Sequence, residues 1–225
     1  MKLLNFKNIN KSKIEKSNDM KRNVITILCV LISILAYSQE DLDQFLVKSG
    51  YIEYELTGST KGTKKIWWDN YGDKEREEIK SVSEVKIFGM VQKEEVHSIH
   101  ISNGDKYWDI NLLDGTGVTG DDSNYDAVDF SEDMTDAEKK KFEEDLLNAL
   151  GGKRLDPENF LGYKCEIIEV MGAKSWLYKG IALKSTANMM GIEVNETAIK
   201  FEENKNIPAS KFEPPVDIEF KESGY

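Results

Sequence analysis

Cysteine and histidine are scarce in this sequence of 225 residues, and their scarcity excludes several kinds of site. The two cysteines are Cys29 and Cys165, and Cys29 lies in an apolar run near the N-terminus, so no disulfide is expected within the folded domain. Cys165 is expected to pack as a small apolar residue. The two histidines, His97 and His100, have HxxH spacing, but residues three apart on a strand point to opposite faces. We therefore predict no metal site, and we expect no cofactor.

The sequence also lacks the motifs of common catalytic and phosphate-binding sites. It contains no GxSxG nucleophile elbow and no glycine-rich phosphate loop. The acidic segment Asp114–Asp133 does not match an EF-hand, because Thr116 and Val118 stand at the third and fifth positions. A weak calcium site in this segment and a hydrolase based on paired carboxylates stay open as alternatives. We predict that the protein is not an enzyme.

The N-terminal region has the form of a signal peptide. A basic pair, Lys21 and Arg22, precedes the apolar run Val24–Ala36, and Ala36 and Ser38 supply the small residues of a cleavage site. The run is shorter than the roughly 20 apolar residues that a permanent membrane-spanning helix needs. Export with cleavage is therefore predicted, and a retained anchor is not.

The expected mature protein is a single domain of residues 39–225. Residues 1–38 are expected to be an N-terminal extension plus signal peptide, with translation starting at Met20 and cleavage after Ser38. Cys29 lies inside the apolar run and not after it, so the sequence has no lipoprotein attachment site. The protein is therefore predicted to be periplasmic or secreted.

Removal of this leader leaves a strongly acidic domain. Of the 30 Lys/Arg and 41 Asp/Glu residues, seven and two lie within residues 1–38, so the mature domain has 23 basic and 39 acidic residues, a net charge of −16. A field of this sign repels nucleic-acid phosphates and anionic lipid headgroups. We therefore expect no nucleic-acid partner.

Alternation of polar and apolar residues predicts a mainly antiparallel sheet. Asn103 and Gly104 between two alternating runs are a strong hairpin signal. A change of phase near Asn195 predicts a bulge, and Pro214 and Pro215 favour an edge position for the last strand. The predicted strands are Tyr51–Leu56, Thr63–Trp68, Lys74–Val82, Val96–Ser102, Lys106–Leu113, Tyr163–Met171, Lys174–Tyr178, Ile181–Met190, Ile192–Phe201 and Val216–Phe220.

Two helices are predicted beside these strands. The first covers Glu40–Val47, where apolar residues recur at helical spacing. The second opens at Thr135 and Glu138, which have capping-box spacing. The acidic segment Asp114–Asp133 before it is expected to be an exposed loop. The plan is α+β, with about nine or ten short antiparallel strands that close into a barrel or wrap a helix.

Large aromatic and methionine side chains are the most distinctive candidates for binding. Trp67 and Trp68 are adjacent on a predicted strand, so one faces each side of the sheet. Aromatic residues mixed with adaptable methionines suit an irregular apolar ligand, although an ordinary core is the alternative. The predicted ligand-binding residues are Trp67, Trp68, Trp108, Trp176, Tyr178, Met189 and Met190.

Several segments together resemble a known family. In order they are Gly162–Glu166, Trp176–Lys184, Met189–Gly191 and Ile207–Pro215, with Ser49–Asp69 as a looser block. They resemble the closing strands of secreted LolA-like half-barrel proteins, relatives of the periplasmic lipoprotein carrier. The resemblance implies a strongly curved antiparallel sheet wrapped around an N-terminal and an inserted helix, enclosing an apolar cavity. By analogy, the stripe of Phe142, Leu146, Leu147 and Leu150 forms a lid over it, and Phe142 and Leu146 join the seven residues above as predicted ligand-binding residues.

The combined prediction is an exported, non-catalytic binding or carrier protein. Its half-barrel cavity is expected to hold an apolar ligand, such as a lipid or acyl chain, or a lipidated envelope protein. The alternative is an envelope protein–protein interaction module with a solid core and an acidic surface. An unfilled cavity of several hundred Å³ favours the first hypothesis, and a solid core favours the second.

Overall fold

The computed structural model describes residues 45–87, 90–121, 135–189 and 192–223. All described residues belong to one compact unit, Ser38–Tyr225. Within them, no helix combines the length and apolar character that a membrane crossing requires. The predicted signal peptide, its cleavage site and most of the helix predicted over 40–47 lie outside the described residues. Leu46 and Val47, at the end of that predicted helix, form bends.

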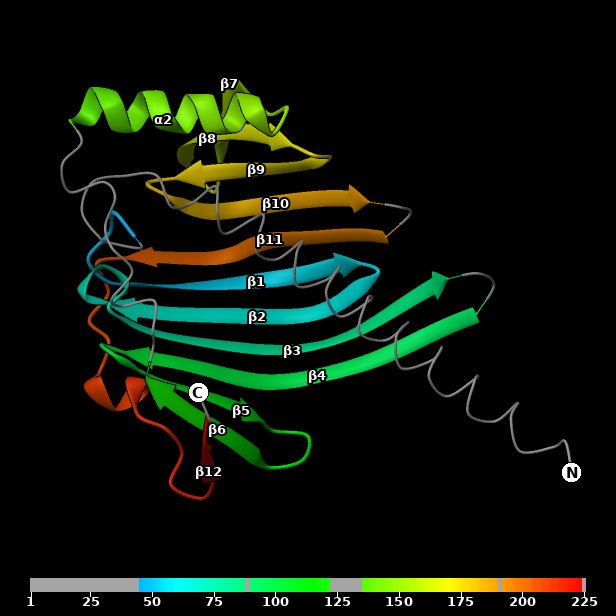
Figure 1. The fold of residues 1–225 in the computed structure, drawn as a ribbon, viewed down its shortest axis with the longest axis vertical. Coiled ribbons are helices and arrows are strands. Elements are labelled where there is room, and N and C mark those ends of the chain that lie inside the picture. Colours follow the sequence, from blue (N-terminus) through cyan, green and yellow to red (C-terminus); the bar gives the residue numbers. More distant parts are fainter. Residues whose placement is uncertain (1–44, 88–89, 122–134, 190–191, 224–225) are drawn as a thin grey trace, which may run out of the picture. The chain divides into compact units, whose positions relative to one another are not determined.

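One curved sheet of 12 strands contains most of the described residues (Figure 1). Its order is β12-β6-β5-β4-β3-β2-β1-β11-β10-β9-β8-β7. Two meanders, β1 to β6 and β7 to β11, are joined where β1 pairs with β11, and β12 is added at the β6 edge. Every pairing is antiparallel except that of β12 with β6. The strands are β1 Gly50–Gly58, β2 Thr60–Asp69, β3 Lys74–Ile87, β4 Met90–Asn103, β5 Lys106–Asn111, β6 Thr116–Asp121, β7 Lys153–Phe160, β8 Tyr163–Val170, β9 Ala173–Tyr178, β10 Ile181–Met189, β11 Ile192–Glu203 and β12 Glu219–Glu222.

The prediction of nine or ten strands was too low, because two strands carry little apolar alternation. β6 lies inside the predicted acidic loop and pairs with β5 and β12. Its Gly117 leaves room for an aromatic ring, since a Cβ there would lie 2.6 Å from Phe220. β7 contains Pro157, beside the register shift between Leu155 and Glu158. It is an edge strand, where a residue without an N–H is tolerated.

The predicted hairpin and bulge are both present, with details that depend on pairing. Asn103 pairs with Lys106, so the turn is Gly104 and Asp105, and Gly104 has a φ of 62°. The register of β1 and β11 shifts between Glu53 and Tyr54, which leaves Ile199 as the extra residue. The bulge is therefore four residues beyond the predicted Asn195. The phase of the sequence indicates an irregularity, but only the partner strand fixes its position.

The inserted helix, α2 Asp136–Ala149, begins with the predicted capping box. The Glu138 N–H donates to Thr135 Oγ1 at 3.4 Å, and the Thr135 N–H donates to Glu138 Oε2 at 2.9 Å. Along its apolar stripe, Leu147 is buried, whereas Phe142 and Leu146 are 58% and 37% exposed. The stripe therefore does not pack as a unit against the sheet.

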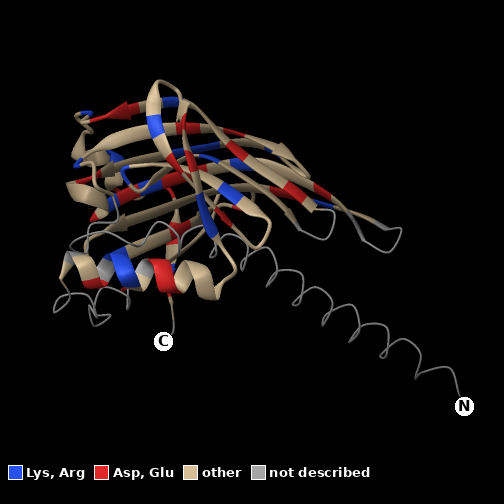
Figure 2. Ribbon diagram, turned by 90° about the horizontal axis from the view of Figure 1, so that it is seen from above, with Lys and Arg blue, Asp and Glu red and all other residues tan. Residues whose placement is uncertain are grey.

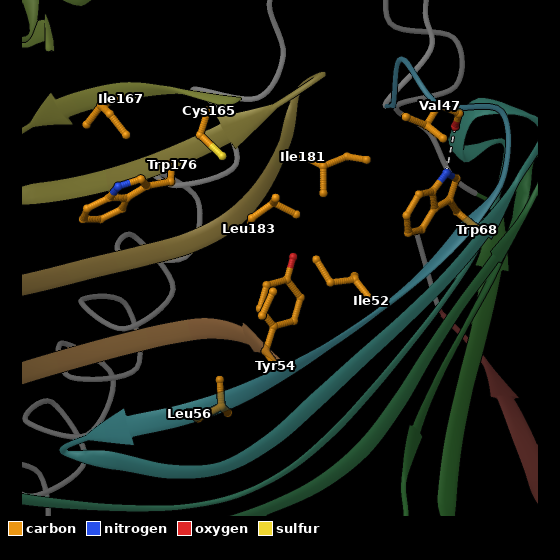
Figure 3. Close-up of a cluster of buried hydrophobic side chains, with 11 residues drawn as sticks. Val47, Ile52, Tyr54, Leu56, Trp68, Cys165, Ile167, Trp176, Ile181 and Leu183 are labelled. Atoms are coloured by element: carbon orange, nitrogen blue, oxygen red, sulfur yellow. Dashed lines mark hydrogen bonds between the residues drawn. The ribbon is translucent and has the colours of Figure 1, made fainter. Parts of the chain in front are cut away.

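The main core fills the inside of the curve. Side chains of β1 and β2 and side chains of β8, β9 and β10 point toward one another there (Figure 3). Trp68 is fully buried and its Nε1–H donates to the Val47 carbonyl at 2.8 Å. Cys165 is also fully buried, as predicted. We call this the inner cluster: Val47, Ile52, Tyr54, Leu56, Trp68, Cys165, Ile167, Trp176, Ile181, Leu183 and Ala198.

Part of the opposite, outer face of β3–β6 is covered by the C-terminal segment. The 3-10 helix η2 Ala209–Phe212 contacts β3 and β4, and Phe212 is buried. Ile218 and Phe220 pack against a second cluster of buried side chains, Ile99, Ile101 and Ile110. β12 occupies the sheet edge, as the prolines predicted.

Candidate functional site

Three of the predicted ligand-binding residues come together in or against the inner cluster. They are Trp68, Trp176 and Tyr178. The Trp176 Nε1–H donates to Glu158 Oε2 at 2.8 Å, and Lys174 and Lys184 place their ammonium groups 4.4 and 4.5 Å from its ring centroid. Both buried indoles therefore have protein partners, and their packing is that of a core.

The other predicted residues lie elsewhere. Trp67 is on the outer face, where its ring centroid is 5.0 Å from that of Tyr51 and 3.6 Å from Lys211 Nζ. Trp108 packs against the second cluster. Met190 and the side chain of Met189 lie outside the described part of the structure. Phe142 and Leu146 lie on exposed α2. The structure does not gather the nine residues into one place, and their role in ligand binding stays a prediction.

A row of charged side chains crosses the inner face beside the inner cluster. Strand register places Tyr54 opposite Lys64, Glu77 opposite His100, and His100 opposite Asp109. Since residues opposite one another share a face, Lys64, Glu77, His100 and Asp109 all lie on the inner side. Glu196 of β11 joins them through its ion pair with Lys64. We call these five residues, Glu196, Lys64, Glu77, His100 and Asp109, the inner charged row.

Lys64 is held in its charged form. Its side chain is 14% exposed, and Nζ lies 4.8 Å from the centroid of the Tyr54 ring. Burial lowers the pKa of Lys64, but the carboxylates of Glu196 and Glu77 outweigh this effect, so its pKa is raised. Lys64 and Glu196 therefore neutralise each other within the row.

Glu77 has no such partner. Among the described residues, no donor or cation lies within hydrogen-bonding or ion-pair distance of its carboxylate. Burial raises the pKa of Glu77, Lys64 and His100 act in the opposite direction, and Glu196 adds repulsion, with a raised pKa as the net result. Glu77 is thus a carboxylate in a setting that disfavours its charge.

The row ends at a hollow on β4, β5 and β6. His100 Nδ1 lies 2.7 Å from Asp109 Oδ1, and this hydrogen bond raises the pKa of His100. The hollow has a volume of about 260 Å³. Its lining is Ser98, Ile99, His100, Asp109, Ile110, Asn111, Thr116, Gly117 and Val118. His97 lies on the other face, opposite Lys80, which confirms that the two histidines point apart.

Sequence motifs did not reveal this row. A signal was present in the segment Lys74–Ile79, where strand alternation puts Glu75 and Glu77 on one face and Arg76 and Glu78 on the other. What the sequence lacks is the register that aligns Glu77 with His100 and Asp109. These three residues come from the consecutive strands β3, β4 and β5, whose register depends on the turns between them.

No protein-family model matches the chain, and no curated protein matches it. Among solved structures, an uncharacterized conserved protein from Thermus thermophilus is similar with a TM-score of 0.50 and 7% identity, over 79% of this chain and 92% of that one. MucB is similar with a TM-score of 0.43 and 11% identity, over 82% of this chain and 61% of its own. The MucA/MucB complex from Pseudomonas aeruginosa is similar with a TM-score of 0.43 and 12% identity, over 84% of this chain and 61% of that one. At 7% identity, the similarity to the Thermus protein shows a shared fold alone. The sheet of this chain is curved and unclosed, as the LolA-like resemblance implies.

Proposed function

We propose that this protein is a non-catalytic binding module of the cell envelope, which recognises a protein partner on the inner face of a LolA-like half-barrel. The observation that carries the proposal is that this face has a buried aromatic part and an exposed polar part. Trp68 and Trp176 are buried within a packed cluster, whereas the side chains of His100 and Asp109 are 42% and 60% exposed. Recognition is therefore assigned to the polar side of the inner face, beyond the aromatic core.

The chemistry of Cys165 supports a non-catalytic role. Its side chain is fully buried in the inner cluster, and burial raises the pKa of the thiol. A catalytic cysteine needs an accessible, stabilised thiolate, and this environment disfavours it.

The test is photo-crosslinking in intact cells from matched positions on the two faces. A photoreactive phenylalanine replaces Val118, which is exposed in the hollow, or Lys80, which is exposed on the outer face of β3. We expect Val118 to give a discrete protein adduct that Lys80 does not give. Equal adducts from both positions, or none from Val118, would contradict the proposal.

Carriage of an apolar ligand is the second candidate, and the exposure of Phe142 and Leu146 on α2 favours it. Burying ten methylenes of an acyl chain offers about 8 kcal/mol, part of which offsets the lost freedom of the ligand. Titration of delipidated protein with long-chain fatty acids should then change tryptophan fluorescence saturably. Trp176→Glu should abolish this response if the variant still folds. A lipid adduct at Val118 in place of a protein adduct would favour the same candidate.

A further inference from the structure

The inner and outer faces of β2–β5 carry different charge. By register, the inner side holds the carboxylates Glu75, Glu77, Glu94 and Asp109, with Lys64 as the one lysine among the described residues. The outer side of the same strands carries both signs, as at Lys74, Arg76, Glu78, Lys80 and Glu84 of β3. Figure 2 shows acidic and basic residues spread along the strands of the sheet. Because successive strand residues point to opposite faces, the order of charged residues in the sequence concentrates negative charge on the inner face of β2–β5.

This inner charge is only partly compensated. Lys64 is already neutralised by Glu196, and Glu77 has no hydrogen-bond or ion-pair partner among the described residues. Asp109 is bonded to His100, whose register places it between Asp109 and Glu77. A cation bound next to Glu77 would offset the repulsion that Glu77 experiences from Glu196, because an opposite charge favours the ionised carboxylate.

The hollow beside His100 and Asp109 has the size and lining for one basic side chain. Its volume of about 260 Å³ lies below the roughly 300–1,000 Å³ of pockets that enclose a small-molecule ligand. Asp109, Asn111 and Thr116 offer oxygen acceptors, and Val118 offers an apolar wall. Lysine and arginine side chains pack their methylene stems on apolar surface while their charged ends bind acceptors.

We propose that the partner presents a basic segment to the inner face, with a lysine or arginine side chain in the hollow beside Asp109 and a second basic side chain at Glu77. The proposal rests on the proposed function and names the chemistry of the partner. Charge complementarity carries it: Glu77, which has no partner among the described residues, the exposed carboxylate of Asp109 and the hollow all lie on the inner face of the consecutive strands β3 to β6. Such complementarity contributes chiefly to specificity and to the rate of association.

The test measures binding of a fluorescently labelled peptide of alternating lysine and alanine, with an alternating glutamate and alanine peptide as the control ligand. The double variant Glu77→Gln/Asp109→Asn removes two inner carboxylates. The matched double variant Glu84→Gln/Glu95→Gln removes the same charge from the outer face of β3 and β4. Thermal melts check that both variants fold.

We expect the inner double variant to weaken binding of the lysine peptide at least about ten-fold, and the outer variant to weaken it less than about two-fold at moderate salt. The single variants Glu77→Gln and Asp109→Asn should each give part of the loss. Equal losses of peptide binding in the two double variants would show that binding depends only on the overall negative charge of the protein, and would overturn the inference. Absence of binding to the native protein would overturn it as well.

Failure of this inference is distinguishable from failure of the proposed function. If Val118 still crosslinks to its protein partner in the Glu77→Gln/Asp109→Asn background with unchanged yield, the inference fails while the proposed function stands. If Val118 gives no protein adduct, the proposed function fails regardless of peptide binding. Loss of the adduct in the inner double variant, but not in the outer one, would support both.

Discussion

Glu77 and Glu78 are neighbours on β3 but lie on opposite faces of the sheet. On the outer face, Glu78 accepts from Arg76 Nε at 2.7 Å and from Lys211 Nζ at 3.2 Å. Burial raises the pKa of Glu78, but these two partners more than offset it, so its pKa is lowered. On the inner face, burial raises the pKa of Glu77 and no partner offsets it fully. The same side chain is thus stabilised in its charged form on one face and destabilised on the other.

The surroundings of the two residues differ in the same way. On the outer face, lysines that lie over aromatic rings also pair with carboxylates: Lys211 lies over Trp67 and pairs with Glu78, and Lys205 lies over Tyr51 and pairs with Glu202. The charges of Glu78 and Glu202 on this face are therefore satisfied within the chain. On the inner face, Glu77 has no hydrogen-bond or ion-pair partner among the described residues, and carboxylates with perturbed pKa values cluster at functional sites.

The largest expected effect contrasts the adjacent tryptophans. Trp68→Ala should cost about 3–5 kcal/mol of unfolding free energy, because it opens a cavity in the inner cluster. Trp67→Ala should cost clearly less, since its ring lies on a half-exposed face and loses mainly contacts with Tyr51 and Lys211. Urea unfolding monitored by circular dichroism measures both. Equal costs would contradict the assignment of the two rings to a core and a surface.

A second prediction contrasts Glu77 with Glu78. Glu77→Gln should raise the unfolding free energy by about 0.5–2 kcal/mol at pH 8, because it removes a charge that the fold disfavours. The folded-state pKa of Glu77 is raised above its ordinary value of 4.5. The gain should therefore be full above the folded pKa and vanish below about 4.5.

Glu78→Gln should do the reverse and lower stability by on the order of 1 kcal/mol. Because the folded-state pKa of Glu78 is lowered, its contribution is present above the ordinary pKa of 4.5 and is lost as the pH falls through the folded value. Thermal melts between pH 3 and pH 8 test the pair. Destabilisation by both substitutions at pH 8 would show that Glu77 has a stabilising partner and would weaken the comparison of the faces.

The smallest effect concerns His100. Asp109→Asn should lower the pKa of His100, which the hydrogen bond to Asp109 raises. The stability that this bond contributes is present below the ordinary histidine value of 6.5 and is lost as the pH rises through the folded pKa. For such an exposed pair the contribution should be under about 1 kcal/mol. NMR titration of the imidazole measures it, and an unchanged pKa in Asp109→Asn would exclude the pairing.

Strongly patterned segments could be predicted well from the sequence, and weakly patterned ones could not. The strand around Ile52 and the capping box at Thr135 are confirmed because period and capping are local properties. β6 was missed because its glycines and threonines show no apolar alternation. It packs against the C-terminal segment, where Phe220 lies against Gly117. The aromatic residues were recognised as important, but their division between the two faces depends on which side of the sheet is covered.

Most of the strands, the inserted helix, the acidic character and the separation of Glu77 from Glu78 onto opposite faces could be read from the sequence alone. These follow from local periods of two and 3.6 and from composition. Strand register in the folded sheet places Glu77, His100 and Asp109 side by side, and the packing of the curved sheet brings Trp176 and Trp68 into one core. The physical reason is register: the turns set it between consecutive strands such as β3, β4 and β5, whereas between β1 and β11, which are distant in sequence, the packing of the whole inner face selects it.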